Sequence, residues 1–460
     1  MKGIDVLPDD DLLAIFDFFY VDINPLYEGK TTVEEWQTLV HVCRRWRSLV
    51  LGSPRRLNLQ LYCTPKTPAR NTLDVWPALP LIVAGNVASS SGTTDNIIAA
   101  FGQSNRIFKV LLDLAGWQVE QVLAAMQVPF PNLTRLRLSS PDDEIDETPP
   151  VVPDSFLDGS APSLRSLELD SIPIPGLPKL LLSATRLVYL RLSDIPHSGY
   201  FSPEAMVALI SALSSLDALE VEFRSPQSCP GRESRSLPPL KRSILPALDD
   251  FRFKGATEYL EDLVASVDAP QLNTLYITFF NQIDFDCPRL AQFVNCTPTF
   301  RTRDEAFIQF DDSTACLKLR YRTSKFYDLE INTSCKESDW QLSFIEQICN
   351  SPLHPLSTVE DLYIEHRYSQ LVWKNDAIDD TLWFELLHPL TAVKNLYLSK
   401  EFAPGIAAAL QELGITEVFP SLQDIFVEGL ESSGSVFGQF ATERIQSGQS
   451  IDISVWNRRM

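Results

Sequence analysis

Histidine and paired cysteine, the residues from which most structural metal sites are built, are scarce in this sequence. Its 460 residues hold five histidines and eight scattered cysteines, and no two cysteines form a C-x-x-C pair. This spacing argues against a zinc site and against a disulfide framework, and it indicates reduced thiols. We therefore expect no metal or other cofactor, and a protein of the cytoplasm, the nucleus or both.

Long apolar runs and an excess of basic charge are also missing. No stretch approaches ~18 uninterrupted apolar residues, the length that suggests a membrane-spanning helix. The opening residues, MKGIDVLPDDDLLAIF, carry acids ahead of any apolar run, which is unlike a secretory signal. With 39 Lys and Arg against 60 Asp and Glu, the formal net charge is −21. Such a surface repels phosphates, so we expect no nucleic-acid partner and no membrane partner.

The sequence also lacks a catalytic constellation. EGKTT at residues 28–32 imitates the end of a phosphate-binding loop, but that loop needs a glycine where this chain has Asn24. His354, His366 and His388 stand apart, without a nucleophile in a known catalytic context. We expect a binding protein that performs no chemistry itself.

A short strand template recurs along the chain. It has the order apolar-x-x-apolar-x-apolar, and the alternation at its end predicts a strand with one buried face. Successive copies are 23 to 34 residues apart, except for one interval of 54 residues. The copies start at Leu133, Leu164, Leu187, Leu216, Leu248, Leu272, Phe326, Val359, Val393 and Leu422.

Helical patterns such as WQVEQVLAAM and SPEAMVALISAL lie between these strands. One strand and one helix at this interval is typical of a leucine-rich repeat, in which each unit buries its leucines against its neighbours. Residues 56–460 therefore resemble an irregular leucine-rich-repeat solenoid of the α/β class, with parallel strands on one face and helices on the other. Ser, Asp and Pro replace the usual Asn or Cys after the strand. A mixed α/β domain with coincidental spacing is the alternative.

Two further features concern the strands of the solenoid. Near residues 298–331, AFIQF, CLKLRY and FYDLEI follow one another closely and predict a strand-rich insertion.

In each copy of the strand template, the residue between the last two apolar positions should point out from the strand surface, and late in the chain this residue becomes aromatic. Exposed aromatic rings among polar neighbours are typical of interfaces, although such rings also form cross-strand pairs that only stabilise a sheet. The interface interpretation predicts a target-binding surface at Tyr276, Tyr363, Tyr397 and Phe426.

Residues 1–55 have a different, helical pattern. VLPDDDLLAIFDFF places apolar residues on one helical face, and LVHVCRRWRSLV adds a second apolar pattern within a segment that carries five arginines and no acid. These two segments resemble an F-box, whose signature is Leu-Pro, a helix with Ile-Phe, and then Val-Cys-basic-x-Trp. The 16-residue stretch YVDINPLYEGKTTVEE between them is longer than the usual connection.

An F-box followed by leucine-rich repeats resembles the substrate receptors of SCF-type cullin–RING ubiquitin ligases, in the form found in fungi. The resemblance implies a Skp-type adaptor as the first partner, a cullin bound through it, and an unknown protein substrate bound by the repeats. The arginines would assist encounter with an acidic adaptor. A scaffold whose N-terminal helices merely cap the solenoid is the alternative. By resemblance, the adaptor-binding residues are Leu7, Pro8, Leu12, Ile15, Phe16, Val42, Cys43 and Trp46.

Overall fold

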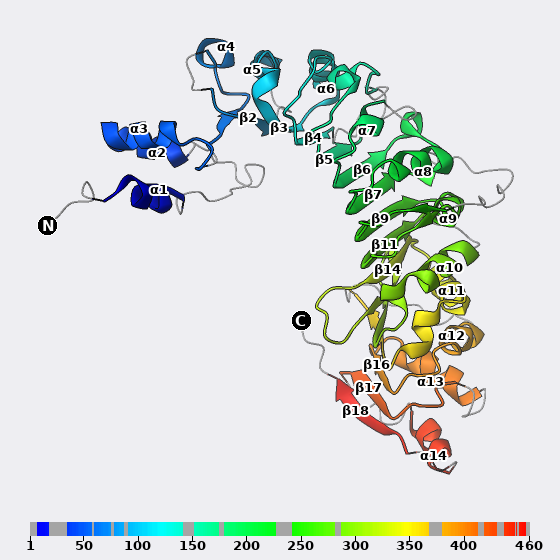
Figure 1. Ribbon diagram of the computed structural model, residues 1–460. Helices are drawn as coiled ribbons and strands as arrows, with labels where there is room; N and C mark the ends of the chain where they lie inside the picture. The colour runs from blue at the N-terminus through cyan, green and yellow to red at the C-terminus, as the bar shows by residue number, and fades with distance from the viewer. Residues whose placement is uncertain are drawn as a thin grey trace. The chain divides into compact units, whose positions relative to one another are not determined.

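Figure 1 shows a computed structural model of the chain, which forms two compact units, Met1–Phe201 and Ser202–Met460. The long connection between the first two helices lies outside the described residues. The structure describes residues 7–17, 35–57, 59–74, 78–86, 91–140, 151–173, 179–226, 242–280, 287–367, 380–412, 418–429, 437–446, 448 and 450–456.

The first unit begins with three helices, α1 (Asp9–Asp17), α2 (Glu35–Val42) and α3 (Arg44–Gly52). A parallel sheet follows, in which each described strand pairs with the next along the chain. Its strands are β1 (Leu61–Cys63), β2 (Leu81–Asn86), β3 (Ile107–Asp113), β4 (Arg135–Ser139), β5 (Ser166–Asp170) and β6 (Tyr189–Ile195). Helices lie along one side of this sheet (Figure 1). They are α4 (Ala69–Thr72), α5 (Ser91–Phe101), α6 (Gly116–Ala125) and α7 (Lys179–Ser183), with 3-10 turns at Ser104–Arg106, Phe156–Gly159 and His197–Gly199.

The second unit repeats the same strand-and-helix arrangement (Figure 1). Its helices are α8 (Pro203–Ser211), α9 (Thr257–Ala265), α10 (Pro288–Cys296), α11 (Ser338–Asn350), α12 (Asp380–Leu387), α13 (Ala403–Glu412) and α14 (Gly438–Gln446), with 3-10 turns at Pro298–Phe300 and His354–Thr358. Its main strands are β7 (Ala218–Phe223), β9 (Asp250–Gly255), β11 (Thr274–Phe279), β12 (Glu305–Phe310), β13 (Thr314–Arg320), β14 (Leu329–Ser334), β15 (Asp361–His366), β16 (Asn395–Leu398), β17 (Asp424–Glu428) and β18 (Asp452–Trp456). A small parallel pair joins β8 (Ser243–Ile244) to β10 (Val267–Asp268).

The leucine template explains why these segments form strands with one buried face. In β16, Leu396 and Leu398 are fully buried, whereas Asn395 and Tyr397 are partly exposed. Successive side chains of a strand point to opposite sides, so the leucines pack toward the helices and the intervening residues form an open surface, here called the strand face. The predicted α/β class and the mostly parallel arrangement of strands and helices are confirmed.

The segment expected to be strand-rich contains β12, β13 and the turn into β14. Within the second unit, the described strands pair in parallel except where β13 meets β12 and β14. The spatial order is β11-β14-β13-β12-β15, so these three strands stand in reverse of their chain order. Phe326, the first position of one template copy, is 80% exposed because it lies in the turn between β13 and β14.

Short polar side chains connect the strand ends of the first unit. The Ser139 hydroxyl donates to Asp170 at 3.0 Å, and the Ser171 hydroxyl donates to Asp194 at 2.8 Å. Ser171 and Asp194 have φ of 60° and 52°, the left-handed region that short polar residues tolerate better than most. Ser and Asp therefore hold neighbouring turns together at positions where the sequence lacks the usual Asn or Cys.

A buried carboxylate joins two neighbouring helices of the second unit. Glu261 in α9 is 2% exposed and accepts the backbone N–H groups of Arg289 and Leu290, at 3.1 and 2.7 Å. These groups lie in the first turn of α10, where N–H groups have no partner within the helix. The side chain of one repeat thus caps the helix of the next.

Candidate functional site

The three N-terminal helices enclose a small core of their own. Leu12 is fully buried, Phe16 is 3% exposed, and the Phe16 ring lies 4.8 Å from the Trp46 ring at an interplanar angle of 60°. Cys43 is the N-cap residue that precedes α3, and its Sγ accepts the Trp46 backbone N–H at 3.4 Å. Leu12 and Phe16 therefore belong to this core, whereas Cys43 and Trp46 pack at its edge and are partly exposed.

Other predicted adaptor-binding residues do reach the surface. Ile15 is 40% exposed and Val42 is 58% exposed, while Pro8 is exposed and Leu7 is half-buried. Ile15 and Val42 are therefore accessible to a binding partner. The eight predicted residues therefore range from buried through partly exposed to exposed, a difference that the sequence motif does not reveal.

The arginine-rich segment has an internal role that the sequence interpretation missed. Arg45 forms an ion pair with Asp9, at 2.6 Å between Nη2 and Oδ1, and also donates to the Leu7 carbonyl oxygen. Arg56 pairs with Asp10 at 2.9 Å. The first acids of α1 are thus bound by arginines from the end of the module, and Arg44 remains exposed.

Aromatic rings form a stack on the strand face of the second unit. Tyr363 lies between Phe307 and Tyr397, with ring centroids 4.4 and 4.3 Å away and planes within 9° of parallel. Tyr397 stacks in turn on Phe426 at 4.6 Å and 8°. The parallel register of β12, β15, β16 and β17 places these residues opposite one another. We call Phe307, Tyr363, Tyr397 and Phe426 the aromatic ladder.

Two contacts border the aromatic ladder. The Arg320 guanidinium lies 4.7 Å from the Phe307 centroid and forms an ion pair with Glu305 at 2.6 Å. Trp456 lies 5.6 Å from Tyr397 and 6.0 Å from Tyr363. Burial, more than the charge of Glu305, raises the pKa of Tyr363, so its phenol keeps its proton at neutral pH. The ladder therefore offers hydroxyl groups and ring edges, because its ring faces largely cover one another.

The structure brings together three of the four predicted target-binding residues. Tyr363, Tyr397 and Phe426 belong to the aromatic ladder, whereas Tyr276 pairs with Glu330 on β14 and lies outside it. Sequence reasoning missed Phe307 and Trp456. A usable signal existed for Trp456, since Ile451, Ile453 and Val455 alternate before it.

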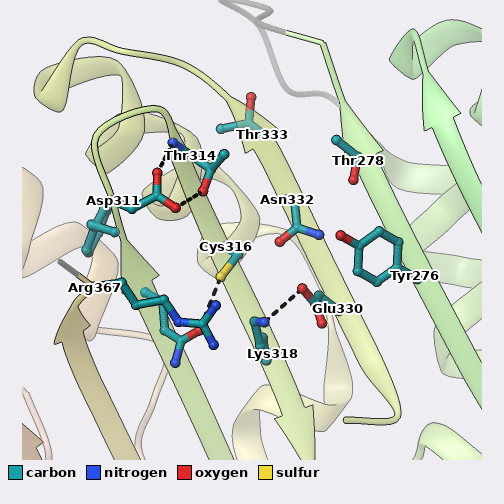
Figure 2. A pocket seen from close by; sticks show the side chains of 12 residues that line it. Tyr276, Thr278, Asp311, Thr314, Cys316, Lys318, Glu330, Asn332, Thr333 and Arg367 are labelled. Carbon is teal, nitrogen blue, oxygen red and sulfur yellow. Dashed lines mark hydrogen bonds and ion pairs between the residues drawn. The ribbon is translucent and has the colours of Figure 1, made fainter. Parts of the chain in front are cut away.

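Tyr276 instead lines a pocket of about 180 Å³ on the strand face, formed by β11, β14, β13 and β12 (Figure 2). An ion pair between Lys318 and Glu330, at 2.9 Å, forms part of its wall. Asn332 is 8% exposed, and its Nδ2 has no hydrogen-bond partner among the described residues. Figure 2 shows this amide between Tyr276 and Cys316, with Arg367 across the pocket.

No known family model matches the chain, and no curated protein matches it. Among solved structures, the leucine-rich repeat-containing protein LegL7 from Legionella pneumophila is similar to 80% of this chain and 90% of its own. The two share 16% identity, with a TM-score of 0.28.

Two kinds of site are missing from the described residues. None of the helices in the described part of the chain has the length and apolar composition that a bilayer crossing needs. Within the same residues, no group of three or more His, Cys, Asp or Glu side chains is placed to hold a metal ion.

Proposed function

We propose that this chain is the substrate-recognition subunit of an SCF-type ubiquitin ligase. In this role, α1–α3 bind a Skp-type adaptor, which connects the chain to a cullin, and the strand face binds a protein target. The chain performs no chemistry; it brings the target to the ligase. The observation that carries the proposal is that helices α1–α3 bury a small core of their own while the apolar side chains of Ile15 and Val42 stay exposed.

The exposed apolar residues support binding better than capping. A cap would bury the apolar face of α1–α3 against the first repeats, because the end of a repeat array must be shielded from water. Ile15 at 40% and Val42 at 58% exposure do not fit a buried cap. Their positions match the Ile and Val of the F-box signature in the sequence.

Adaptor binding can be tested with changes that leave the module's core intact. Ile15→Asp and Val42→Asp place a charge on exposed apolar positions and should abolish co-precipitation of a purified Skp-type adaptor. Val128→Asp is a matched control, because Val128 is 43% exposed and lies outside the module. Leu12 and Phe16 are unsuitable, since their replacement would open the core.

The outcome separates the two roles of the N-terminal helices. Loss of the adaptor in the two variants, with circular dichroism unchanged and the control still bound, supports the ligase role. If the wild-type chain does not bind an adaptor, or both variants bind it as the control does, the scaffold role is favoured instead.

The aromatic ladder is the proposed centre of target binding. Tyr is enriched at protein interfaces, and the tyrosines here carry hydroxyl groups on half-buried rings. A Tyr363→Phe, Tyr397→Phe double variant keeps the stacked rings and removes only the hydroxyls. It should retain the adaptor and lose co-purifying targets in affinity purification; an unchanged set of targets would place target binding elsewhere.

A further inference from the structure

The pocket formed by β11–β14 contains a buried hydrogen-bond donor that has no partner among the described residues. Asn332 is more than nine-tenths buried, and its Nδ2 finds no acceptor among the described residues although it lines the pocket. A buried donor left without an acceptor destabilises the folded protein. Arg367 is exposed, follows β15 directly and lines the same pocket with its guanidinium group.

The acids in and beside the pocket already have donors. Glu330 is neutralised by Lys318 at 2.9 Å, and Glu365 accepts from Gln309 at 2.8 Å. Asp311 accepts the Thr314 hydroxyl and backbone N–H, both at 2.7 Å. Burial alone would raise the pKa of Asp311, but these hydrogen bonds and those from Ser313 lower it. The carboxylate therefore stays ionised, and its oxygens already accept hydrogen bonds. None of these acids needs a further donor from a ligand.

Two other side chains contribute little charge to the pocket. Burial raises the pKa of the Cys316 thiol to about 12, so this group is neutral at physiological pH. Burial also raises the pKa of the Tyr276 phenol, which therefore keeps its proton and can donate it in a hydrogen bond. Among the described residues that line the pocket, the Asn332 amide is thus the buried donor that still needs an acceptor.

We propose that this pocket binds a carboxylate group, which accepts hydrogen bonds from the Asn332 amide and pairs with the Arg367 guanidinium. A volume of about 180 Å³ suits a single side chain or chain terminus of a protein ligand, rather than a large cofactor. Guanidinium groups match the geometry of carboxylates, which distinguishes this ligand from a neutral carboxamide of the same shape. The proposal does not depend on the ligase role, and its test needs no adaptor.

The Asn332 amide is itself a spectroscopic reporter. The full chain labelled with ¹⁵N-asparagine gives side-chain NH₂ signals, and the Asn332 pair is assigned by its loss in Asn332→Asp. Three probes are titrated: N-acetylglutamate α-amide, its neutral analogue N-acetylglutamine amide, and N-acetylalanine. The first and third carry a side-chain and a terminal carboxylate, so together they distinguish the two sources of the group.

The expected result is a saturable shift of the Asn332 signals with at least one carboxylate probe and none with the glutamine analogue. Arg367→Gln should weaken this binding about tenfold, the size expected for loss of a charged hydrogen bond. Arg301→Gln is the matched control, because Arg301 is exposed and does not line the pocket.

Three results would each overturn the proposal. They are no shift at roughly 10 mM of either carboxylate probe, where even weak binding is measurable; an equal shift with the glutamine analogue; and unchanged affinity in Arg367→Gln. The first would mean that water alone satisfies the Asn332 amide.

Discussion

Replacing Tyr397 by alanine tests how much the aromatic ladder stabilises the second unit. The ring has neighbours on both faces, Tyr363 at 4.3 Å and Phe426 at 4.6 Å, with planes 8° to 9° from parallel. Aromatic pairs are worth about 0.5–1.5 kcal/mol each beyond the area they bury. Tyr397→Ala removes two such pairs and should therefore lower the free energy of unfolding by about 1–3 kcal/mol before burial is counted.

Tyr397→Phe is the matched control, since it keeps both stacked pairs and loses only the hydroxyl. The free energy of unfolding of Tyr397→Phe should fall by no more than about 1 kcal/mol, the usual net value of one hydrogen bond. Urea denaturation followed by circular dichroism measures both variants. With an m-value of about 1–3 kcal/mol per M, the alanine variant should unfold at a midpoint about 1 M lower.

The comparison decides between the two roles of the ladder. If alanine and phenylalanine give the same midpoint, the stacked geometry contributes nothing to stability and the reasoning from ring packing is refuted. If alanine alone is destabilised, the ladder is a structural element, and target binding must be examined with the phenylalanine variants.

Three further predictions follow from the contacts described. Glu261→Ala should destabilise the second unit by about 1–3 kcal/mol in the same urea assay, since it leaves buried N–H groups of α10 without an acceptor, whereas Glu261→Gln should recover part of the loss. Iodoacetamide at pH 8 should modify exposed Cys296 long before Cys316, whose pKa of about 12 leaves almost no thiolate; equal rates by peptide mass spectrometry would contradict the packing. Arg45→Ala should speed amide exchange at the start of α1 by a few-fold, because an exposed ion pair is worth about 1 kcal/mol or less, while Arg44→Ala should have no effect.

Local pattern was sufficient to predict most of the repeat strands and how they align, although it missed β18. Apolar residues at alternating positions define which side of most repeat strands is buried, and the recurring template aligns neighbouring strands. Arg137, Glu168 and Arg191 therefore lie opposite one another as the spacing predicts. The same alignment brings Tyr397 between Tyr363 and Phe426.

Pairings between distant segments could not be predicted in the same way. Phe307 joins the ladder only because β12 pairs with β15 and not with β11, and nothing local in AFIQF specifies that partner. The Asn332 pocket arises from the same rearrangement of strands. Arg45 and Asp9 are 36 residues apart, and each charge alone is compatible with a solvated helix surface.

The reversed order of β12, β13 and β14 has a consequence for how the chain acquires its structure during synthesis. In a regular repeat array, each new strand can pair with the one made just before it, so folding spreads repeat by repeat. Here β11 must wait for β14, because β14 is its partner and β12 and β13 are made first. The growing chain therefore exposes one unpaired edge of β11 until residue 334, the end of β14, has emerged from the ribosome. Because pairing between distant segments is slow, we expect translation-coupled folding to pause here and chaperones to be recruited at this point.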